Sequence, residues 1–296
     1  MNLSPSRQGH LAMLAFSALV AGSFSLGAMA APHVSPSALT VLRFALACVV
    51  AGGFVWARGG VTRTAFSAPW RHLVLGGLYA AYFVLMFEGL RTASAVSESA
   101  VFTLTPIMAA GFGWLILRQV TTPRMALALA CGAAGALWVI FRADLSALLG
   151  FHVGRGEAVY FWGCVAHAVY APLVRAFNRG EPPAVLSLGV MVSGLILVSL
   201  WGWRDVVATD WAALPRIVWI CLVYVAVAAT AITTILLQYA AIRLPAAKVM
   251  AYTYLVPSWV ILWELALGHS APPVLVLGGV ALTVVALLLL LKDEHR

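Results

Sequence analysis

Apolar stretches of about twenty residues recur along almost the whole chain, and each is long enough for one α-helix to cross a bilayer. Cutting the sequence at charged residues, prolines and glycines separates ten spans. They cover residues 11–30, 38–57, 72–90, 95–117, 125–141, 157–177, 184–203, 216–241, 246–267 and 274–291. Because 63% of the residues are hydrophobic and only 9% are charged, the chain lacks the polar surface of a soluble globule. The strand-like alternation of a membrane β-barrel is also missing, so the sequence predicts an all-α polytopic membrane protein with ten transmembrane helices.

The net charge of +8 does not indicate a nucleic-acid partner, because the basic residues are scattered singly between the spans. The four cysteines lie inside apolar spans without metal-ligand spacing, so we expect no disulfide framework, no metal and no cofactor. The first span ends in AMA-A, which is also typical of a signal-peptide cleavage site. Its apolar run is longer than such peptides usually have, and we interpret it as the first membrane helix.

Lys and Arg residues in alternate connections predict the orientation. Those on the side of the N-terminus are Arg7, Arg58, Arg63, Arg71, Arg118, Arg124, Arg175, Arg179, Arg243, Lys292 and Arg296. Those on the other side are Arg91, Arg142, Arg155, Arg204 and Arg216. The positive-inside rule therefore predicts a multi-pass protein of the cell inner (plasma) membrane with both termini in the cytoplasm.

The two halves of the sequence resemble each other. FTLTPIMAAGFGWLIL in the fourth span resembles YTYLVPSWVILWELAL in the ninth, and Gly9 with Pro36 recurs 147 residues later as Gly156 with Pro183. We therefore expect two repeats, 1–150 and 151–296, with five spans each. An odd number of spans inverts one repeat relative to the other, and inverted repeats around a central cavity are a common design of secondary transporters.

The segments VLRFALA in the second span and TASAVSESAVFTLTPIMAAGFGWLIL in the fourth carry a resemblance to a known family. With the ten spans and the repeat, the whole chain resembles an EamA-type member of the drug/metabolite transporter superfamily, and its many aromatic residues resemble the aromatic amino acid exporter branch. The Gly-Glu that commonly follows spans four and nine in that family reads Arg118-Gln119 and Gly268-His269 here. No role of those glutamates can therefore be carried over.

Candidate site residues first appear on the fourth and ninth spans. Pro106 and Pro257 lie near the middle of these spans, where each predicts a kink and frees a carbonyl four residues earlier, at Phe102 and Thr253. Helical spacing places further candidates on equivalent faces: Glu98, Phe102 and Thr105 on the fourth span, and Lys248, Tyr252 and Trp259 on the ninth.

Ionisable residues inside membrane spans indicate faces that turn away from lipid. We expect Glu98 to influence an outer gate and Lys248 to attract a substrate carboxylate from the cytoplasm. Alternatively, Glu98 is a packed, hydrogen-bonded residue and Lys248 snorkels to the inner interface. Arg43 in the second span predicts a structural or gating salt bridge near the outer surface.

Three other spans supply aromatic and polar candidates. The third carries Tyr79, Tyr82, Phe83 and Met86, the sixth carries Trp162, His167 and Tyr170, and the eighth carries Thr234 and Gln238. Central rings with hydroxyl groups suit a planar apolar substrate. The same rings can instead pack helices together. His167 can line the cavity, can relay protons, or can tie two helices together as a neutral residue.

These features predict a secondary transporter that exports small metabolites, chiefly aromatic or other apolar amino acids, by alternating access. Its partners are then a small-molecule substrate and the lipid bilayer, and we expect a monomer. A nucleoside, a threonine-like amino acid or a drug is an alternative substrate. The chain has no P-loop, HExxH or carboxylate spacing for metal chemistry, so we predict that it is not an enzyme; a lipid-modifying enzyme or a helical sensor is the competing interpretation.

Overall fold

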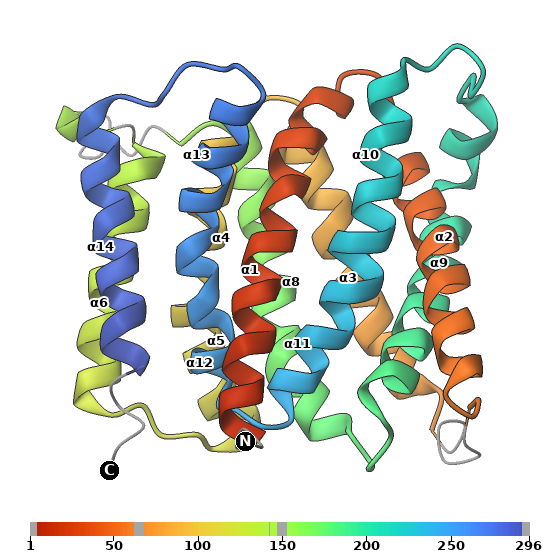
Figure 1. Cartoon of the computed structure of the whole chain (residues 1–296), viewed down its shortest axis with the longest axis horizontal. Coiled ribbons are helices and arrows are strands. Elements are labelled where there is room, and N and C mark those ends of the chain that lie inside the picture. Colours follow the sequence, from red (N-terminus) through yellow and green to blue (C-terminus); the bar gives the residue numbers. More distant parts are fainter. Residues whose placement is uncertain (1–4, 62–67, 142, 147–152, 292–296) are drawn as a thin grey trace.

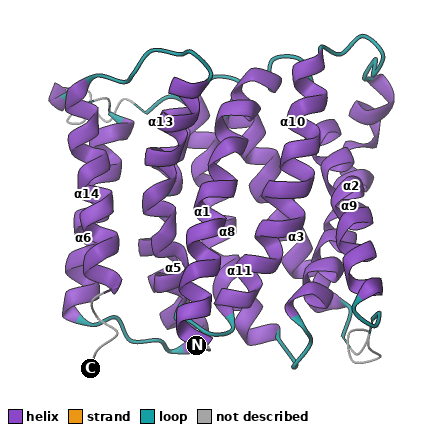
Figure 2. Cartoon of the chain, in the orientation of Figure 1, coloured by secondary structure: helices purple, strands orange, loops and turns teal. Residues whose placement is uncertain are grey.

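The protein is a bundle of membrane-length helices in which no described residue forms a strand (Figure 1, Figure 2). The structure, a computed structural model, describes residues 5–61, 68–141, 143–146 and 153–291. Arg63, Arg142, Lys292 and Arg296 of the orientation argument lie outside the described residues. The described chain starts and finishes at the same edge of the bundle, the lower one in Figure 1, which we call the terminal edge. The polytopic all-α fold is confirmed.

Each predicted span corresponds to one helix or to a stack of consecutive helical segments. The first half contains α1 (Pro5–Ala30), α2 (Pro36–Ala57), α3 (Trp70–Gly89), α4 (Ala95–Phe102), α5 (Thr105–Leu117) and α6 (Pro123–Ile140). The second half contains α8 (Arg155–Phe177), α9 (Pro183–Ala208), α10 (Arg216–Ala226), the π-helix η2 (Val227–Ile232), α11 (Thr233–Ala241), α12 (Ala246–Ala251), the 3₁₀ segment η3 (Tyr252–Leu255), α13 (Val256–Ala266) and α14 (Val274–Leu291).

Local sequence explains where several helices begin. Pro36, Pro123 and Pro183 occupy first-turn positions, where the missing N–H costs nothing and the fixed φ suits the helix. Thr122 and Ser94 cap the helices that follow them, since their hydroxyl oxygens accept the backbone N–H groups of Met125 and Ser97.

The fourth and ninth spans are each broken near their proline, and Pro106 and Pro257 lie in the first turn of a new helix. The expectation of two free carbonyls is wrong. The Thr105 hydroxyl donates to the Phe102 carbonyl at 2.7 Å, and the backbone N–H of Val256 donates to the Thr253 carbonyl. Local hydrogen bonds thus replace those that the prolines remove.

Helix packing follows the inverted relationship of the two repeats. Equivalent spans pack against each other: α2 with α9, α6 with α14, and the fourth span with the ninth through α5 with α12 and α4 with α13. In the same way, α8 packs against α3 while its counterpart α1 packs against α10 and α11. Five crossings separate the start of α1 from the start of α8, so the second repeat begins at the opposite edge. The exact division at residue 150 stays a prediction.

Eight of the described helices or helix stacks are long and apolar enough to cross a membrane by length and composition. The last helix, α14, is a shorter apolar helix, and α8 is not among the eight. The sixth span was nevertheless predicted correctly as a helix of the bundle. α8 packs against α3, α4 and α5 and so can carry polar residues such as Glu157 and His167 among protein rather than lipid.

Candidate functional site

Aromatic side chains from three helices meet inside the bundle. We call this the aromatic cluster; it consists of Tyr79, Tyr82 and Phe83 of α3, Phe102 of α4, and Tyr160, His167 and Tyr170 of α8, none more than 1% exposed. The rings of Tyr79 and Tyr170 stack with centroids 5.0 Å apart, and those of Tyr82 and His167 are 4.4 Å apart. The structure therefore brings together six predicted site residues, which are Tyr79, Tyr82, Phe83, Phe102, His167 and Tyr170.

Glycines let α3 and α8 approach closely at this point. A Cβ atom added to Gly163 would lie 3.2 Å from the Tyr82 carbonyl oxygen, and one added to Gly156 would lie 2.5 Å from that of Gly89. Larger residues at these positions would separate the two helices. The small residues thus place the rings of α3 within contact distance of those of α8.

Polar side chains surround one side of the cluster. Gln238 donates to the Tyr170 hydroxyl at 2.8 Å and accepts from Ser187 at 2.9 Å, while a 3.0 Å hydrogen bond joins Thr234 to the Tyr79 hydroxyl. Thr234 and Gln238, two of the predicted site residues, thus contact the aromatic cluster. The Tyr160 hydroxyl donates a hydrogen bond to the Tyr82 hydroxyl at 3.2 Å, which is a second polar contact of the cluster.

The His167 imidazole lies within the cluster without a partner for its Nδ1 atom among the described residues. Phe102 meets it edge-on, with ring centroids 5.3 Å apart. Such a nitrogen is available to hydrogen-bond a ligand that enters between the rings.

Arg43 of α2 borders the cluster and differs from its prediction. It is fully buried within the bundle, and its guanidinium carbon lies 3.4 Å from the centroid of the Phe83 ring. Its Nε donates to Thr230 and its Nη2 to the Ala229 carbonyl at 2.8 Å, so the predicted salt bridge is replaced by bonds to η2. The sequence carried one signal, a lone arginine within an apolar span, but gave no sign of the π-helix that receives it.

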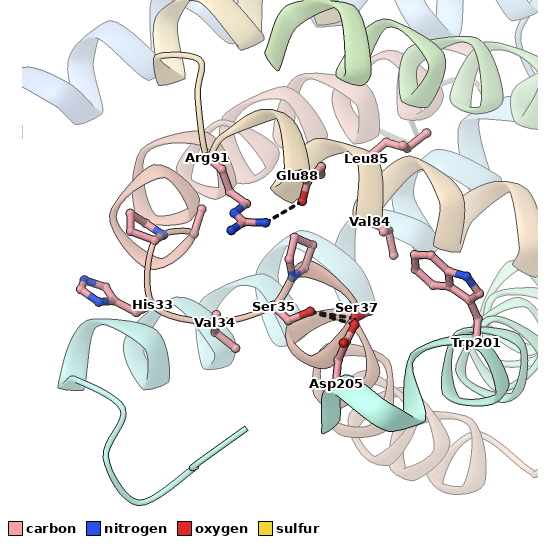
Figure 3. Close-up of a pocket in the computed structure, with 13 residues that line it drawn as sticks. His33, Val34, Ser35, Ser37, Val84, Leu85, Glu88, Arg91, Trp201 and Asp205 are labelled. Carbon is pink, nitrogen blue, oxygen red and sulfur yellow. Dashed lines mark hydrogen bonds and ion pairs between the residues drawn. The ribbon is translucent and has the colours of Figure 1, made fainter. Parts of the chain in front are cut away.

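A pocket of about 600 Å³ opens at the edge opposite the termini (Figure 3). It is lined by residues 31–37, Val84, Leu85, Glu88, Arg91, Trp201 and Asp205. Asp205 accepts hydrogen bonds from Ser35 and Ser37, and Arg91 pairs with Glu88 at 3.2 Å. No periodic sequence pattern indicates this pocket, because its wall combines a connecting loop with the ends of α3 and α9.

A second pocket of about 300 Å³ lies towards the terminal edge. Its lining includes Gln119, Arg175 and Ala247, which come from both repeats. None of the aromatic cluster residues lines either pocket, because the rings fill the centre by contacting one another. The described conformation is therefore closed between the two pockets.

The model of the EamA-like transporter family matches the chain twice, over residues 7–141 and 154–292. The chain belongs to this family. The uncharacterized transporter YyaM of Bacillus subtilis (strain 168) is 25% identical over 277 residues, which cover 92% of this chain and 90% of YyaM. A solved crystal structure shares the fold with a TM-score of 0.75 at 20% identity, and the likeness covers 99% of both chains. The resemblance to the EamA family is confirmed, whereas the aromatic amino acid exporter branch stays a prediction.

Within this EamA-family fold, Glu98 and Lys248 lie apart from the cluster. Glu98 is fully buried at the start of α4, with neither carboxyl oxygen hydrogen-bonded to a described residue. The interpretation of Glu98 as a hydrogen-bonded residue is therefore wrong. Lys248 is 7% exposed in α12, at the other end of the bundle. Neither residue lines the two pockets, and their gating roles stay predictions.

Trp162 is not brought to the site. It is 65% exposed, because five residues before His167 a side chain points about 140° away around the helix. It borders an apolar lateral pocket of about 430 Å³ between α4, α6 and α8.

The remaining candidates have partners elsewhere. Tyr252 is hydrogen-bonded to His10 at 2.9 Å, and Trp259 donates to Ser17 at 3.2 Å, so both tie the ninth span to α1. Thr105 lies 3.2 Å from Thr253, which links the two broken helices where they cross. Met86 is buried on α3, one turn beyond Phe83.

Proposed function

We propose that this EamA-family transporter exports small metabolites with a planar apolar group, chiefly aromatic amino acids, by alternating access through the aromatic cluster. The observation that carries the proposal is the cluster itself. Rings from α3 and α4 of the first repeat meet rings from α8 of the second, so relative movement of the repeats would open a ring-lined space.

The two pockets supply the ends of the proposed route. On α3, Glu88 of the first pocket lies six residues beyond Tyr82, which is about 9 Å along the helix. On α8, Arg175 of the second pocket lies five residues beyond Tyr170, about 7.5 Å along the helix in the other direction. A substrate would pass from the terminal-edge pocket through the cluster to the opposite pocket.

The excess of Lys and Arg on the N-terminal side supports a cytoplasmic location of the terminal edge. Transport would then run from the cytoplasm towards the pocket in Figure 3. A reporter that is active only in the cytoplasm, fused to the C-terminus, tests this orientation; activity of a periplasm-specific reporter there would contradict it.

Counterflow in proteoliposomes tests the substrate. We expect preloaded phenylalanine, tyrosine or tryptophan to exchange with labelled phenylalanine, whereas threonine, nucleosides and sugars do not. Parallel assays with a labelled nucleoside identify that substrate class if the amino acids fail to move. Movement of a nucleoside alone would refute the aromatic amino acid proposal and leave the family assignment intact.

Variants test the place of the site. We expect Tyr82→Ala and His167→Ala to lower the transport rate at least tenfold with unchanged protein levels, because both rings belong to the cluster. Trp162→Ala is the matched control, since it removes an aromatic ring from the same helix on its exposed side. Wild-type rates in the two cluster variants would show that substrate passes elsewhere.

A further inference from the structure

The buried guanidinium of Arg43 has more hydrogen-bond donors than its surroundings use. Its Nε and Nη2 atoms donate to Thr230 and to the Ala229 carbonyl, but its Nη1 atom has no partner among the described residues. The side chain is 0% exposed, and no carboxylate of the described chain forms an ion pair with it. A permanently charged group is thus held inside the bundle with an unpaired N–H edge.

The π-helix fixes this guanidinium in place. The Thr230 hydroxyl donates its proton to the Val225 carbonyl at 2.7 Å, which leaves its oxygen to accept from Arg43 Nε. The wider turn of η2 leaves the Ala229 carbonyl to accept from Nη2. Two anchored nitrogens and the Phe83 ring below the plane hold the group so that Nη1 is the edge left for a ligand.

The guanidinium also adjoins the aromatic cluster. Phe83, which lies against the guanidinium, packs edge-on against Tyr79 with ring centroids 4.5 Å apart. Phe44, one residue after Arg43, also contacts Tyr79 and Phe83. A ligand whose planar group enters between the rings would therefore bring a polar end close to Arg43.

The unpaired Nη1 atom of Arg43 indicates which polar group such a ligand would carry. Burial of an unpaired charge is costly, and the ring face only partly compensates for the lost water. A carboxylate supplies a negative charge and two acceptor oxygens in one plane, which matches the planar donor edge of a guanidinium. An ammonium group would instead be repelled.

We propose that Arg43 Nη1 binds the carboxylate of the transported metabolite, so that the site selects molecules combining a carboxylate with a planar apolar group. This inference rests on the proposed function and narrows its substrate class. The carboxylate is required and the amino group is not, which distinguishes aromatic acids from nucleosides, amides and amines. Arg43 is then a specificity-determining residue rather than part of a gate.

A set of phenylalanine analogues tests the proposal in the wild-type protein. The thermal stabilisation of the purified protein is titrated with phenylalanine, 3-phenylpropionate, phenylalaninamide and phenethylamine, and the same compounds compete in counterflow. We expect the two acids to bind at least tenfold more tightly than the amide and the amine. Equal binding of the amide or the amine, or no binding of either acid, would overturn the inference.

Variants locate the effect at Arg43. We expect Arg43→Gln to bring acids and amides to equal affinity, and Arg43→Lys to retain a reduced preference because it keeps the charge without the planar edge. Arg58→Gln is the matched control, since Arg58 is an exposed arginine directly after the last residue of the same helix. An acid preference that persists in Arg43→Gln would overturn the inference. If that variant does not fold, the wild-type analogue series decides.

The binding assay also separates this inference from the proposed function. If acids bind selectively but nothing is exchanged across the membrane, transport of these molecules fails while the carboxylate site stands. If aromatic amino acids are exchanged but their amides bind equally well, the carboxylate site fails while the transport proposal stands.

Discussion

Removal of Arg71 should destabilise the protein through a single buried ion pair at the terminal edge. Arg71 Nη2 donates to Glu181 Oε1 at 2.6 Å, and the two side chains are 1% and 0% exposed. Further donors of Arg71 reach the carbonyls of Ala68 and Phe177. The pair therefore joins the start of α3 in the first repeat to the α8–α9 connection in the second.

The magnitude follows from the burial of both partners. Deletion of one member of a buried pair costs about 3–5 kcal/mol, because the remaining charge is left uncompensated. Glu181 keeps a 2.7 Å hydrogen bond from the backbone N–H of Arg179, so we expect Arg71→Leu to lose about 3 kcal/mol, the lower end of that range. The double variant Arg71→Leu with Glu181→Leu should recover most of this loss, since no charge stays buried.

The free energy of unfolding is measured by SDS titration with tryptophan fluorescence for the wild type, Arg71→Leu, Glu181→Leu and the double variant. Together the four values give the coupling energy between Arg71 and Glu181. Arg58→Leu is a control that removes an exposed arginine at the same edge. A loss below about 1 kcal/mol for Arg71→Leu, or a double variant no more stable than the single one, would refute the reasoning.

The pair also predicts an acid dependence. Burial acts to raise the pKa of Glu181, but the hydrogen bonds from Arg71 and the backbone N–H of Arg179 outweigh it and hold that pKa below its ordinary value of 4.5. A depressed carboxyl pKa stabilises the fold fully above the ordinary value and loses this contribution as the pH falls through the folded-state pKa. Glu181→Gln should therefore flatten the loss of stability below about pH 4.5.

Two smaller predictions concern packing and hydrogen bonds. Gly89→Ala should lower the unfolding temperature, because the new Cβ would lie 2.8 Å from the backbone carbonyl oxygen of Gly156 and would also clash with the Glu98 carboxylate. Gly53→Ala, with nothing within 4 Å, should leave the unfolding temperature unchanged or slightly raised; equal effects would contradict the packing argument. Gln238→Leu should cost about 1–3 kcal/mol of stability by leaving the buried Tyr170 hydroxyl without its donor, and an unchanged unfolding temperature would show that this hydroxyl finds another partner.

Much of the site could be predicted from helical periodicity. Tyr79, Tyr82 and Phe83 share a face of α3, and His167 and Tyr170 share a face of α8, because their spacing matches the turn of the helix. Trp162 lies five residues before His167 and does not share that face. Its position around the helix turns it outwards, where it is 65% exposed.

Other features depend on contacts between helices and carry no local signal. Arg43 was expected to pair with a carboxylate, but its partners are Thr230 and Ala229, 187 and 186 residues away, in a π-helix that no sequence pattern announced. Which acceptor a buried donor finds is decided by the helix packed against it.

The sequence by itself determined the solvent, the ten helical spans and the two repeats, because the length and periodicity of an apolar span are properties of a single helix in a bilayer. The tertiary structure decided which faces meet. Close approach of α3 and α8 at Gly156 and Gly163 assembles the rings, and the contact of α2 with η2 leaves one edge of Arg43 without a partner. Both depend on the relative placement of segments far apart in the chain, which the pattern within any one segment does not encode.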